Sequence, residues 1–294
     1  MAGPALVMEM VYCQLMLLRR LRCIMLNWKI VSGGQSKIPI AGVGLFLIGS
    51  FVMKPQDRII VALDAPLLDG ACNIASVLKG SVGAFKVGLE ILTSEGAPRV
   101  VKALSPHGRL FFDGKFKDIP NTVAGAARAA TRLDVWMFNV HCLGGVTMMS
   151  AAVKSADEEA EKLDRKRPLV IGVTVLTSID AKALNEIGFE HVRDGGKKLV
   201  VRLALLAKQA GLDGVVASPQ EITAIKEACG GDFLVVTPGV RPLWASNDDQ
   251  KRVMTPGEAV KAGADYLVIG RPITNPPKEI GTPADAVKKI IGEL

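Results

Sequence analysis

The sequence predicts one (β/α)8 barrel over residues 53–294, preceded by an N-terminal extension, residues 1–52, that does not match the rest. Three observations predict the barrel. Short apolar runs rich in β-branched residues recur eight times, and stretches rich in Ala, Lys, Glu and Leu separate them, which is the pattern of consecutive parallel βαβ units. The length is close to the roughly 250 residues that eight such units use. Nearly every run is ended by a polar or charged residue or by a glycine.

The eight strand-like runs follow one another along the chain. They are residues 58–64, 84–88, 109–113, 135–141, 169–175, 214–218, 233–239 and 265–270. The clearest helix-like stretches are residues 121–133, 146–162, 195–211 and 283–294. A doubly wound open sheet is the alternative for such a chain, and it usually has a glycine-rich turn after its first strand. The turn here, LDAPLLDG, contains no GxGxxG.

The residues at the carboxyl ends of the runs favour a closed barrel. Barrel enzymes build their active sites at this face from the ends of several strands. One or two polar residues there would be ordinary helix caps, but here they follow most of the strands. They are Asp64, Asp113, His141, Ser218, Gly239 and Arg271.

Charge and cysteine usage exclude several classes of protein. The formal net charge is +7, of which the extension carries +4, from five basic residues against one acidic, and residues 53–294 carry +3. A chain with mixed charges and no clustered basic face is not a nucleic-acid-binding protein, although a mild excess of base suits an anionic substrate. Five scattered cysteines without a CxxC pair indicate reduced thiols and a cytoplasmic location. The three histidines lie far apart, so we expect no metal site.

The extension has a composition of its own. It holds five of the ten methionines and two apolar stretches, residues 5–18 and 38–52. The second stretch is shorter than the roughly 20 residues of a membrane span and contains glycines and a proline. A poor signal sequence or membrane anchor is the alternative. We interpret residues 1–52 as upstream sequence translated from an early start codon, take Met53 as the natural start, and expect no membrane association.

A dense group of charges ends the third run. In FFDGKFKD, residues 111–118, Asp113 and Lys115 lie on the same face of a strand because side chains alternate, and Asp118 follows in the loop. Lys86, in AFKVG, lies at the end of the neighbouring strand. A bare DxK pair is most often a structural ion pair. Four alternating charges at one barrel mouth compensate one another's burial and can hold a lysine ammonium beside a reaction centre.

Several motifs together resemble one family. They are VALD (61–64), FKVG (85–88), DGKFKDIPNT (113–122), NVH (139–141), VTVLTS (173–178), TPGVRP (237–242), DQKRVMTP (249–256) and ADYLVIGRPIT (264–274). In this order, over residues 56–293, they resemble the orotidine 5′-phosphate decarboxylases of the bacterial type. The resemblance implies a barrel of the ribulose-phosphate-binding superfamily that acts as a homodimer. It also implies the decarboxylation of orotidine 5′-monophosphate to UMP, the last step of de novo pyrimidine nucleotide synthesis, without a cofactor or metal.

The resemblance implies a role for each residue of the charged array. Lys115 is the proton-donating lysine and Asp113 is the central aspartate. Asp64 and Lys86 contact the ribose hydroxyls, and Lys86 also belongs to the catalytic array. Asp118 completes the array in the neighbouring subunit, so the homodimer is required for full activity.

Further contacts to the substrate are implied from two loops. Ile119 and Thr122 accompany the interface aspartate into the partner's site. Thr177 is the hydroxyl that reads the pyrimidine, although Ser178 and Thr174 are close enough to keep the register open.

The residues implied to bind the substrate phosphate all lie in the C-terminal part of the chain. The resemblance implies that Arg241, Gln250, Gly270 and Arg271 hold the phosphate. The physical chemistry agrees, because barrel enzymes often bind phosphate at the loops after strands 7 and 8 and arginine suits the geometry of phosphate oxygens. Taken singly, Arg241 is as often an ordinary solvated loop residue, and Gln250, in the exposed-looking run NDDQKR, is more often one.

The chain departs from the family pattern at a few positions. Gly114 replaces a bulkier apolar residue and can loosen the strand between two catalytic groups. Lys117 stands where many relatives carry histidine, and its parity predicts that it points away from the barrel mouth. We expect Cys142 to be a buried thiol and His141 to have a structural hydrogen-bonding role rather than a catalytic one.

Two other functions stay open at this point. Sugar-phosphate decarboxylases and aldolase-like synthases of the same superfamily use a similar DxKxxD array with a magnesium ion. A non-catalytic barrel that binds phosphate or a nucleotide is the second alternative. The DIPNT, DQKR and GRPIT segments favour the nucleotide enzyme over the first, and the complete lysine–carboxylate array argues against the second.

Overall fold

The computed structural model describes residues 53–189, 196–245 and 254–294, which all belong to one compact unit, Met53–Leu294. The interpretation of residues 1–52 and the expected phosphate contact of Gln250 lie outside the described residues. None of the helices in the described ranges has the length and apolar character needed to cross a membrane.

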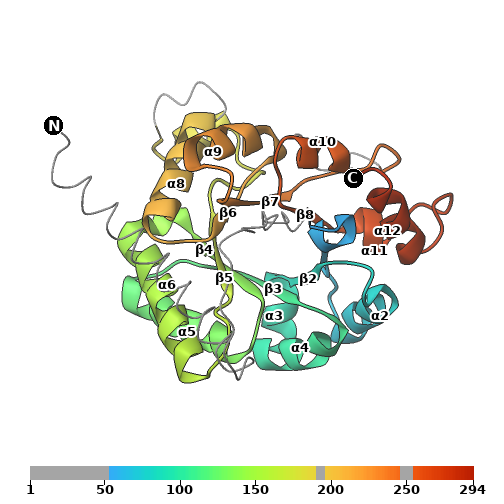
Figure 1. Cartoon of the computed structure of the whole chain (residues 1–294), viewed down its shortest axis with the longest axis horizontal. Coiled ribbons are helices and arrows are strands. Elements are labelled where there is room, and N and C mark those ends of the chain that lie inside the picture. Colours follow the sequence, from blue (N-terminus) through green and yellow to red (C-terminus); the bar gives the residue numbers. More distant parts are fainter. Residues whose placement is uncertain (1–52, 190–195, 246–253) are drawn as a thin grey trace, which may run out of the picture. The chain divides into compact units, whose positions relative to one another are not determined.

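In the described residues, eight parallel strands form a closed barrel in which β1 pairs with β8 (Figure 1). The strands are β1 (Ile59–Ala62), β2 (Ala84–Val87), β3 (Leu110–Phe116), β4 (Met137–His141), β5 (Leu169–Val173), β6 (Gly214–Val216), β7 (Leu234–Pro238) and β8 (Tyr266–Ile269). Each strand overlaps one of the eight predicted runs, so the predicted (β/α)8 barrel is confirmed.

Helices surround the barrel (Figure 1). They are α2 (Leu68–Leu78), α3 (Leu89–Glu95), α4 (Ala97–Leu104), α5 (Pro120–Arg132), α6 (Gly145–Lys162), α7 (Ala181–Glu186), α8 (Lys197–Gln209), α9 (Ile222–Cys229), α10 (Pro256–Lys261), α11 (Arg271–Thr274) and α12 (Pro283–Ile291). Short 3-10 helices are η1 (Pro55–Arg58), η2 (Ser105–His107), η3 (Cys142–Gly144) and η4 (Pro219–Glu221). The four predicted helical stretches correspond to α5, α6, α8 and α12.

Side chains of alternating strand residues form two apolar layers. The layer inside the barrel consists of Ile60, Ala62, Ala84, Phe111, Met137, Ile171, Val236, Tyr266 and Val268. Residues of the opposite parity, such as Val61, Phe85 and Phe138, pack outward against the helices. Burial on both faces explains why the strands are continuously apolar in sequence.

The N-terminal ends of the strands carry ion pairs that support the fold. Asp213 accepts a hydrogen bond from the backbone N–H of Val170 at 2.7 Å and pairs with two nitrogens of Arg167 at 2.8 Å. Asp265 accepts from a backbone N–H of β7 and from Lys226 Nζ, both at 2.7 Å. These carboxylates satisfy strand donors at the end of the barrel where barrel enzymes place stability rather than catalysis.

The pairing of β3 with β4 is irregular near its carboxyl end. Phe112 pairs with Phe138, but the next pair is Phe116 with Val140, so four steps along β3 match two along β4. A β-bulge of this kind bends a strand and re-aims its side chains. The additional residues fall in the segment 113–115, which carries two of the predicted catalytic groups.

Candidate active site

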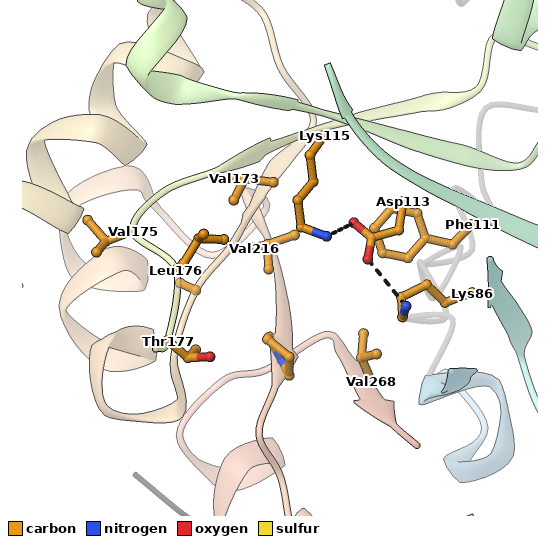
Figure 2. A pocket seen from close by; sticks show the side chains of 12 residues that line it. Lys86, Phe111, Asp113, Lys115, Val173, Val175, Leu176, Thr177, Val216 and Val268 are labelled. Carbon is orange, nitrogen blue, oxygen red and sulfur yellow. Dashed lines mark hydrogen bonds and ion pairs between the residues drawn. The ribbon is translucent and has the colours of Figure 1, made fainter. Parts of the chain in front are cut away.

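Asp113 lies between two lysines at the carboxyl end of the barrel (Figure 2). Its Oδ1 accepts a hydrogen bond from Lys115 Nζ at 2.7 Å, and its Oδ2 lies 3.3 Å from Lys86 Nζ. Lys86 also donates to Asp64 Oδ1 at 2.9 Å. The pairing of β1 with β2 and of β2 with β3 brings these residues together. The result is a continuous chain of alternating charges across three neighbouring strands.

Attraction between the charges dominates the electrostatics of this array. The side chains of Asp113 and Lys86 are each only 11% exposed. Burial alone would raise the pKa of Asp113, but Lys86 and Lys115 hold that pKa below its ordinary value. Burial alone would lower the pKa of Lys86, but Asp113 and Asp64 hold it above its ordinary value. Asp113 and Lys86 are therefore both charged at neutral pH.

Lys115 has an uncommon backbone conformation. Its φ is 49°, in the left-handed region that residues other than glycine seldom adopt. Its backbone N–H donates to Asn139 Oδ1 at 2.7 Å, and Nδ2 of Asn139 donates to Oδ1 of Asp113 at 2.7 Å. In Figure 2 the side chains of Lys115 and Asp113 point toward one another. Conformations of this kind persist where the surroundings hold them, and they cluster at active sites.

A cavity of about 200 Å³ opens beside these charges. Its wall is mostly apolar and is formed by Phe111, Val173, Val175, Leu176, Val216, Ala217, Pro238 and Val268. Thr177, in the loop after β5, lies across the cavity from Asp113 (Figure 2). The cavity is thus an apolar slot with charged groups at one side and a hydroxyl at the other.

The three candidate hydroxyls of the loop after β5 have different surroundings. Thr177 lines the cavity. Thr174 is fully buried, and its Oγ1 donates to the carbonyl of Val216 at 2.9 Å. Ser178 is exposed and is not part of the cavity wall. Of the three, Thr177 is the hydroxyl with access to a ligand in this cavity.

A second hollow of about 350 Å³ adjoins the first and shares Lys86, Pro238 and Val268 with it. Its other walls include Ala62, Asp64, Gly239, Val240, Arg241, Gly270, Arg271 and Thr274. Two arginines from the ends of β7 and β8 therefore face one hollow, as the sequence predicted. Arg241 is buried within the wall, whereas Arg271 is exposed at the start of α11.

Asp118, Ile119 and Thr122 lie on the outer surface, where the chain passes from β3 into α5. All three are exposed, and Ile119 retains 66% of its accessible surface. Oδ1 of Asp118 accepts from the backbone N–H of Ile119 at 2.6 Å. Among the described residues, Asp118 makes no ion pair with Lys115. The single chain therefore does not bring Asp118 into the charged array.

Aromatic rings fill the space that a side chain at Gly114 would need. A Cβ at Gly114 would lie 2.6 Å from Cε1 of Phe112 and 3.0 Å from Cε1 of Phe116. The rings of Phe112 and Phe116 have centroids 5.7 Å apart, and Phe116 is 5.9 Å from Phe138. The sequence suggested that Gly114 loosens the strand. In the structure the aromatic rings pack closely around this glycine.

His141 and Cys142 lie beside the array without joining it. His141 lines a separate small hollow with the exposed Lys117. Burial, Lys117 and Lys115 hold the pKa of His141 below its ordinary value. Its Nδ1 has no hydrogen-bond partner among the described residues, so the expected hydrogen-bonding role is not seen at this atom. Cys142 is 1% exposed, and burial raises the pKa of its thiol to about 12, as expected for an inert thiol.

The arrangement defines a class of protein. A closed parallel barrel whose charged strand ends surround a cavity at the carboxyl face is a (β/α)8-barrel enzyme. Within the described ranges, no group of three or more His, Cys, Asp or Glu side chains is placed to hold a metal ion.

Comparisons with known proteins identify the family within this class. The model of the orotidine 5'-phosphate decarboxylase / HUMPS family matches residues 57–289. The orotidine 5'-phosphate decarboxylase of Moorella thermoacetica is 52% identical over 243 residues, which cover 82% of this chain and 94% of that protein. That of Syntrophomonas wolfei is 50% identical and covers 82% of this chain and 99% of that protein. The chain belongs to the orotidine 5'-phosphate decarboxylase / HUMPS family.

A solved structure agrees with the sequence comparison. The crystal structure of orotidine 5'-phosphate decarboxylase from Lactobacillus acidophilus superimposes with a TM-score of 0.68 at 34% identity. The match covers 80% of this chain and 98% of that one. The shared part is the barrel.

Asn139 belongs to the NVH motif, and the sequence alone did not assign it a role. Asn139 has the same parity as Met137, which lies inside the barrel, and it is 1% exposed. A polar residue of inward parity in the middle of an apolar strand was the available signal, because a buried amide needs hydrogen-bond partners. The identity of those partners depends on the bulge in β3.

Proposed function

We propose that this protein decarboxylates orotidine 5′-monophosphate to UMP, the last step of de novo pyrimidine nucleotide synthesis. The observation that carries the proposal is the placement of Asp113 between Lys86 and Lys115 beside an apolar cavity. The relatives at about 50% identity, which are named orotidine 5'-phosphate decarboxylases, support it. The protein is thus a carboxy-lyase.

The two adjoining hollows suit the parts of a nucleotide. The pyrimidine ring occupies the apolar cavity, where Thr177 faces its polar edge. Lys86 and Asp64, at the junction with the second hollow, contact the ribose hydroxyls. Arg241, Gly270 and Arg271 hold the phosphate, and we assign Gln250 to the same group from the family motif.

Lys115 carries the chemistry. When the bond between C6 and the carboxylate breaks, CO2 leaves and the electron pair stays on C6. The Lys115 ammonium stabilises this developing charge by electrostatics in a site fixed before reaction. It then transfers a proton to C6, which forms the C6–H bond of UMP, and solvent reprotonates the amine.

Asp113 holds the two lysines in position. Because the pKa of Asp113 is held low by Lys86 and Lys115, its carboxylate is ionised, and its Oδ1 accepts a hydrogen bond from Lys115 Nζ at 2.7 Å. Its negative charge also lies near the position of the substrate carboxylate, and this repulsion is relieved when CO2 departs. The family roles of Asp113 and Lys115 fit this geometry without a cofactor.

We also propose that the active unit is a homodimer. Asp118, with Ile119 and Thr122, would enter the partner's site, which accounts for the exposure of all three. Exposed Leu67, which precedes α2, and Leu89, the first residue of α3, support an apolar face at the same end of the barrel. A carboxylate from the partner would give Lys115 a second acidic neighbour.

Two further assignments belong to the proposal. We assign decarboxylase activity to the barrel, residues 53–294, because the family match and the charged array both fall within it. We assign a cytoplasmic location because Cys72, Cys142 and Cys229 are free thiols, which suit a reducing compartment.

A magnesium-dependent sugar-phosphate enzyme is the rival within the same family. The test is to mix the full-length protein with orotidine 5′-monophosphate and to follow the loss of the orotate absorbance with and without EDTA. We expect loss of absorbance at the same rate in both, with release of CO2. Absence of turnover, or turnover that EDTA abolishes, would contradict the proposal and favour the sugar-phosphate branch.

A further inference from the structure

We infer that Asn139 is a positioning residue for the decarboxylation: its side-chain amide holds the Lys115 backbone and the Asp113 carboxylate in one fixed arrangement. The inference rests on the proposed function for its kinetic part. Its structural part concerns how the array is built and stands independently of the substrate.

The first hydrogen bond of Asn139 holds the backbone of Lys115. The pairing of β3 with β4 is interrupted between Phe112 and Phe116, so Lys115 lies within the bulge. There, its N–H donates to Oδ1 of Asn139 at 2.7 Å. A buried N–H needs such a partner, and this one fixes Lys115 at its left-handed φ of 49°. The amide oxygen of Asn139 thus accepts from the backbone of the catalytic lysine within the bulge.

The second hydrogen bond of Asn139 fixes the carboxylate of Asp113. Nδ2 donates to Oδ1 of Asp113 at 2.7 Å, and the same oxygen accepts from Lys115 Nζ at 2.7 Å. The other oxygen is left facing Lys86 at 3.3 Å. The orientation of the amide is determined, because a backbone N–H can only donate and Asn139 must turn its oxygen toward Lys115. Its NH2 then points to the carboxylate.

The surroundings of Asn139 make it a support rather than a ligand. It is 1% exposed, and it is not one of the residues that line the described cavity. Its effect on a substrate must therefore pass through Asp113 and Lys115. An aspartate in its place would lack the donor to Asp113, and a leucine would lack both the donor and the acceptor.

The first experiment compares Asn139→Leu with the unchanged full-length protein. We expect kcat for orotidine 5′-monophosphate to fall about 100-fold, the loss that a small misplacement of catalytic groups causes. KM and the Kd of UMP should change less than about threefold, because the phosphate and pyrimidine contacts remain. Thr237→Val is the matched control, since Thr237 is a fully buried strand residue whose hydroxyl has no partner among the described residues. Equal loss of kcat and of UMP affinity, or unchanged kcat, would overturn the inference.

A crystal structure of Asn139→Leu separates this inference from the proposed function. We expect Lys115 to leave the left-handed region and the contact between Lys115 Nζ and Asp113 to lengthen. Retention of φ near 49° and of the 2.7 Å contact would overturn the inference, whatever the substrate. Failure of the unchanged protein to consume orotidine 5′-monophosphate would instead contradict the proposed function alone.

Asn139→Asp provides a second variant should the leucine variant not fold. It keeps an acceptor for Lys115 but places a second carboxylate against Asp113, and like charges raise the pKa of a carboxyl group. We expect the acid limb of its kcat–pH profile to lie at higher pH than that of the unchanged protein. An unshifted acid limb would overturn the inference, because a purely structural asparagine would not affect the ionisation of the array.

Discussion

Lys115 Nζ lies 2.7 Å from Oδ1 of Asp113, although only one residue separates the two in the strand. Alternation along the strand gives both side chains the same face, and the contact forms within the bulge of β3, where Lys115 has a left-handed φ of 49°. The pair is partly buried, with side chains 29% and 11% exposed, so its attraction is only weakly screened. The chemistry proposed for the site depends on this pair.

Asp113→Asn tests the electrostatic role of the central carboxylate. The change leaves Lys115 and Lys86 without their shared partner, and we expect a loss of about 3 kcal/mol in the free energy of unfolding at neutral pH, as for other broken buried pairs. Because the folded pKa of Asp113 is depressed, its contribution is complete above the unfolded value and disappears as the pH falls through the folded value. The difference in the free energy of unfolding between Asp113→Asn and the unchanged protein should therefore become smaller at acid pH.

Urea titrations from neutral pH down to the acid range measure this difference. A constant gap between the unfolding midpoints of the two proteins would mean that Asp113 does not have a depressed pKa in the folded state.

Gly114→Ala tests the aromatic packing beneath the array. The new Cβ would lie 2.6 Å from the Phe112 ring, so the ring or the strand must move. We expect a loss of about 1–3 kcal/mol, typical of an overpacked core, with a fall in kcat as the array is displaced. Gly125→Ala in α5 is the matched control, because its nearest neighbour, Arg128 Nη2, is 3.8 Å away.

The control should stabilise the protein by about 1 kcal/mol, the helix propensity difference between glycine and alanine. Thermal or chemical unfolding of Gly114→Ala and Gly125→Ala measures both changes in stability. Equal stability of Gly114→Ala and the unchanged protein would show that the rings adapt freely.

Arg271→Ala tests whether phosphate binding contributes to catalysis. We expect a loss of about 100-fold in kcat/KM, the size expected for a charge-assisted hydrogen bond. Both affinity and turnover should fall, because binding energy from a remote group is used to orient the reacting ring. Steady-state kinetics measure the two effects, with Lys154→Ala, an exposed cation of α6, as the control. A change in KM with unchanged kcat would mean that Arg271 binds the phosphate but does not contribute to turnover.

Mixed dimers test the shared active site. Lys115→Ala and Asp118→Ala should each be nearly inactive alone, because each removes one part of every site. After the two variants are unfolded and refolded together, half of the dimers carry one intact site, so we expect about a quarter of the unchanged activity. Activity that stays at the level of the separate variants would contradict a site built from two subunits.

Much of the barrel could be predicted from local sequence. Continuous apolar runs and helical stretches repeat eight times, and each strand overlaps a predicted run because burial on both faces leaves a strong pattern. Only β3 extends beyond its run, by the residues 114–116. The meeting of Lys86 with Asp113 was also predictable, since parallel neighbours end at the same face. The two arginines after β7 and β8 came together for the same reason.

The details of the array could not be predicted in the same way. Strict alternation gives Asp113 and Lys115 the same face, but it contains no information on a bulge or on the left-handed φ of Lys115. The partners of Asn139 depend on the register between β3 and β4. The fit of Gly114 beneath Phe112 likewise depends on ring positions in three dimensions.

The most direct test of the account is Lys115→Ala, measured for both turnover and binding. Loss of the orotate absorbance from orotidine 5′-monophosphate gives kcat, and calorimetric titration with UMP gives Kd. We expect kcat to fall by at least about 1,000-fold, because the group that stabilises and protonates C6 is gone, while UMP binds within about tenfold of the unchanged protein. Turnover within tenfold of the unchanged protein would contradict the central claim that Lys115 carries the reaction.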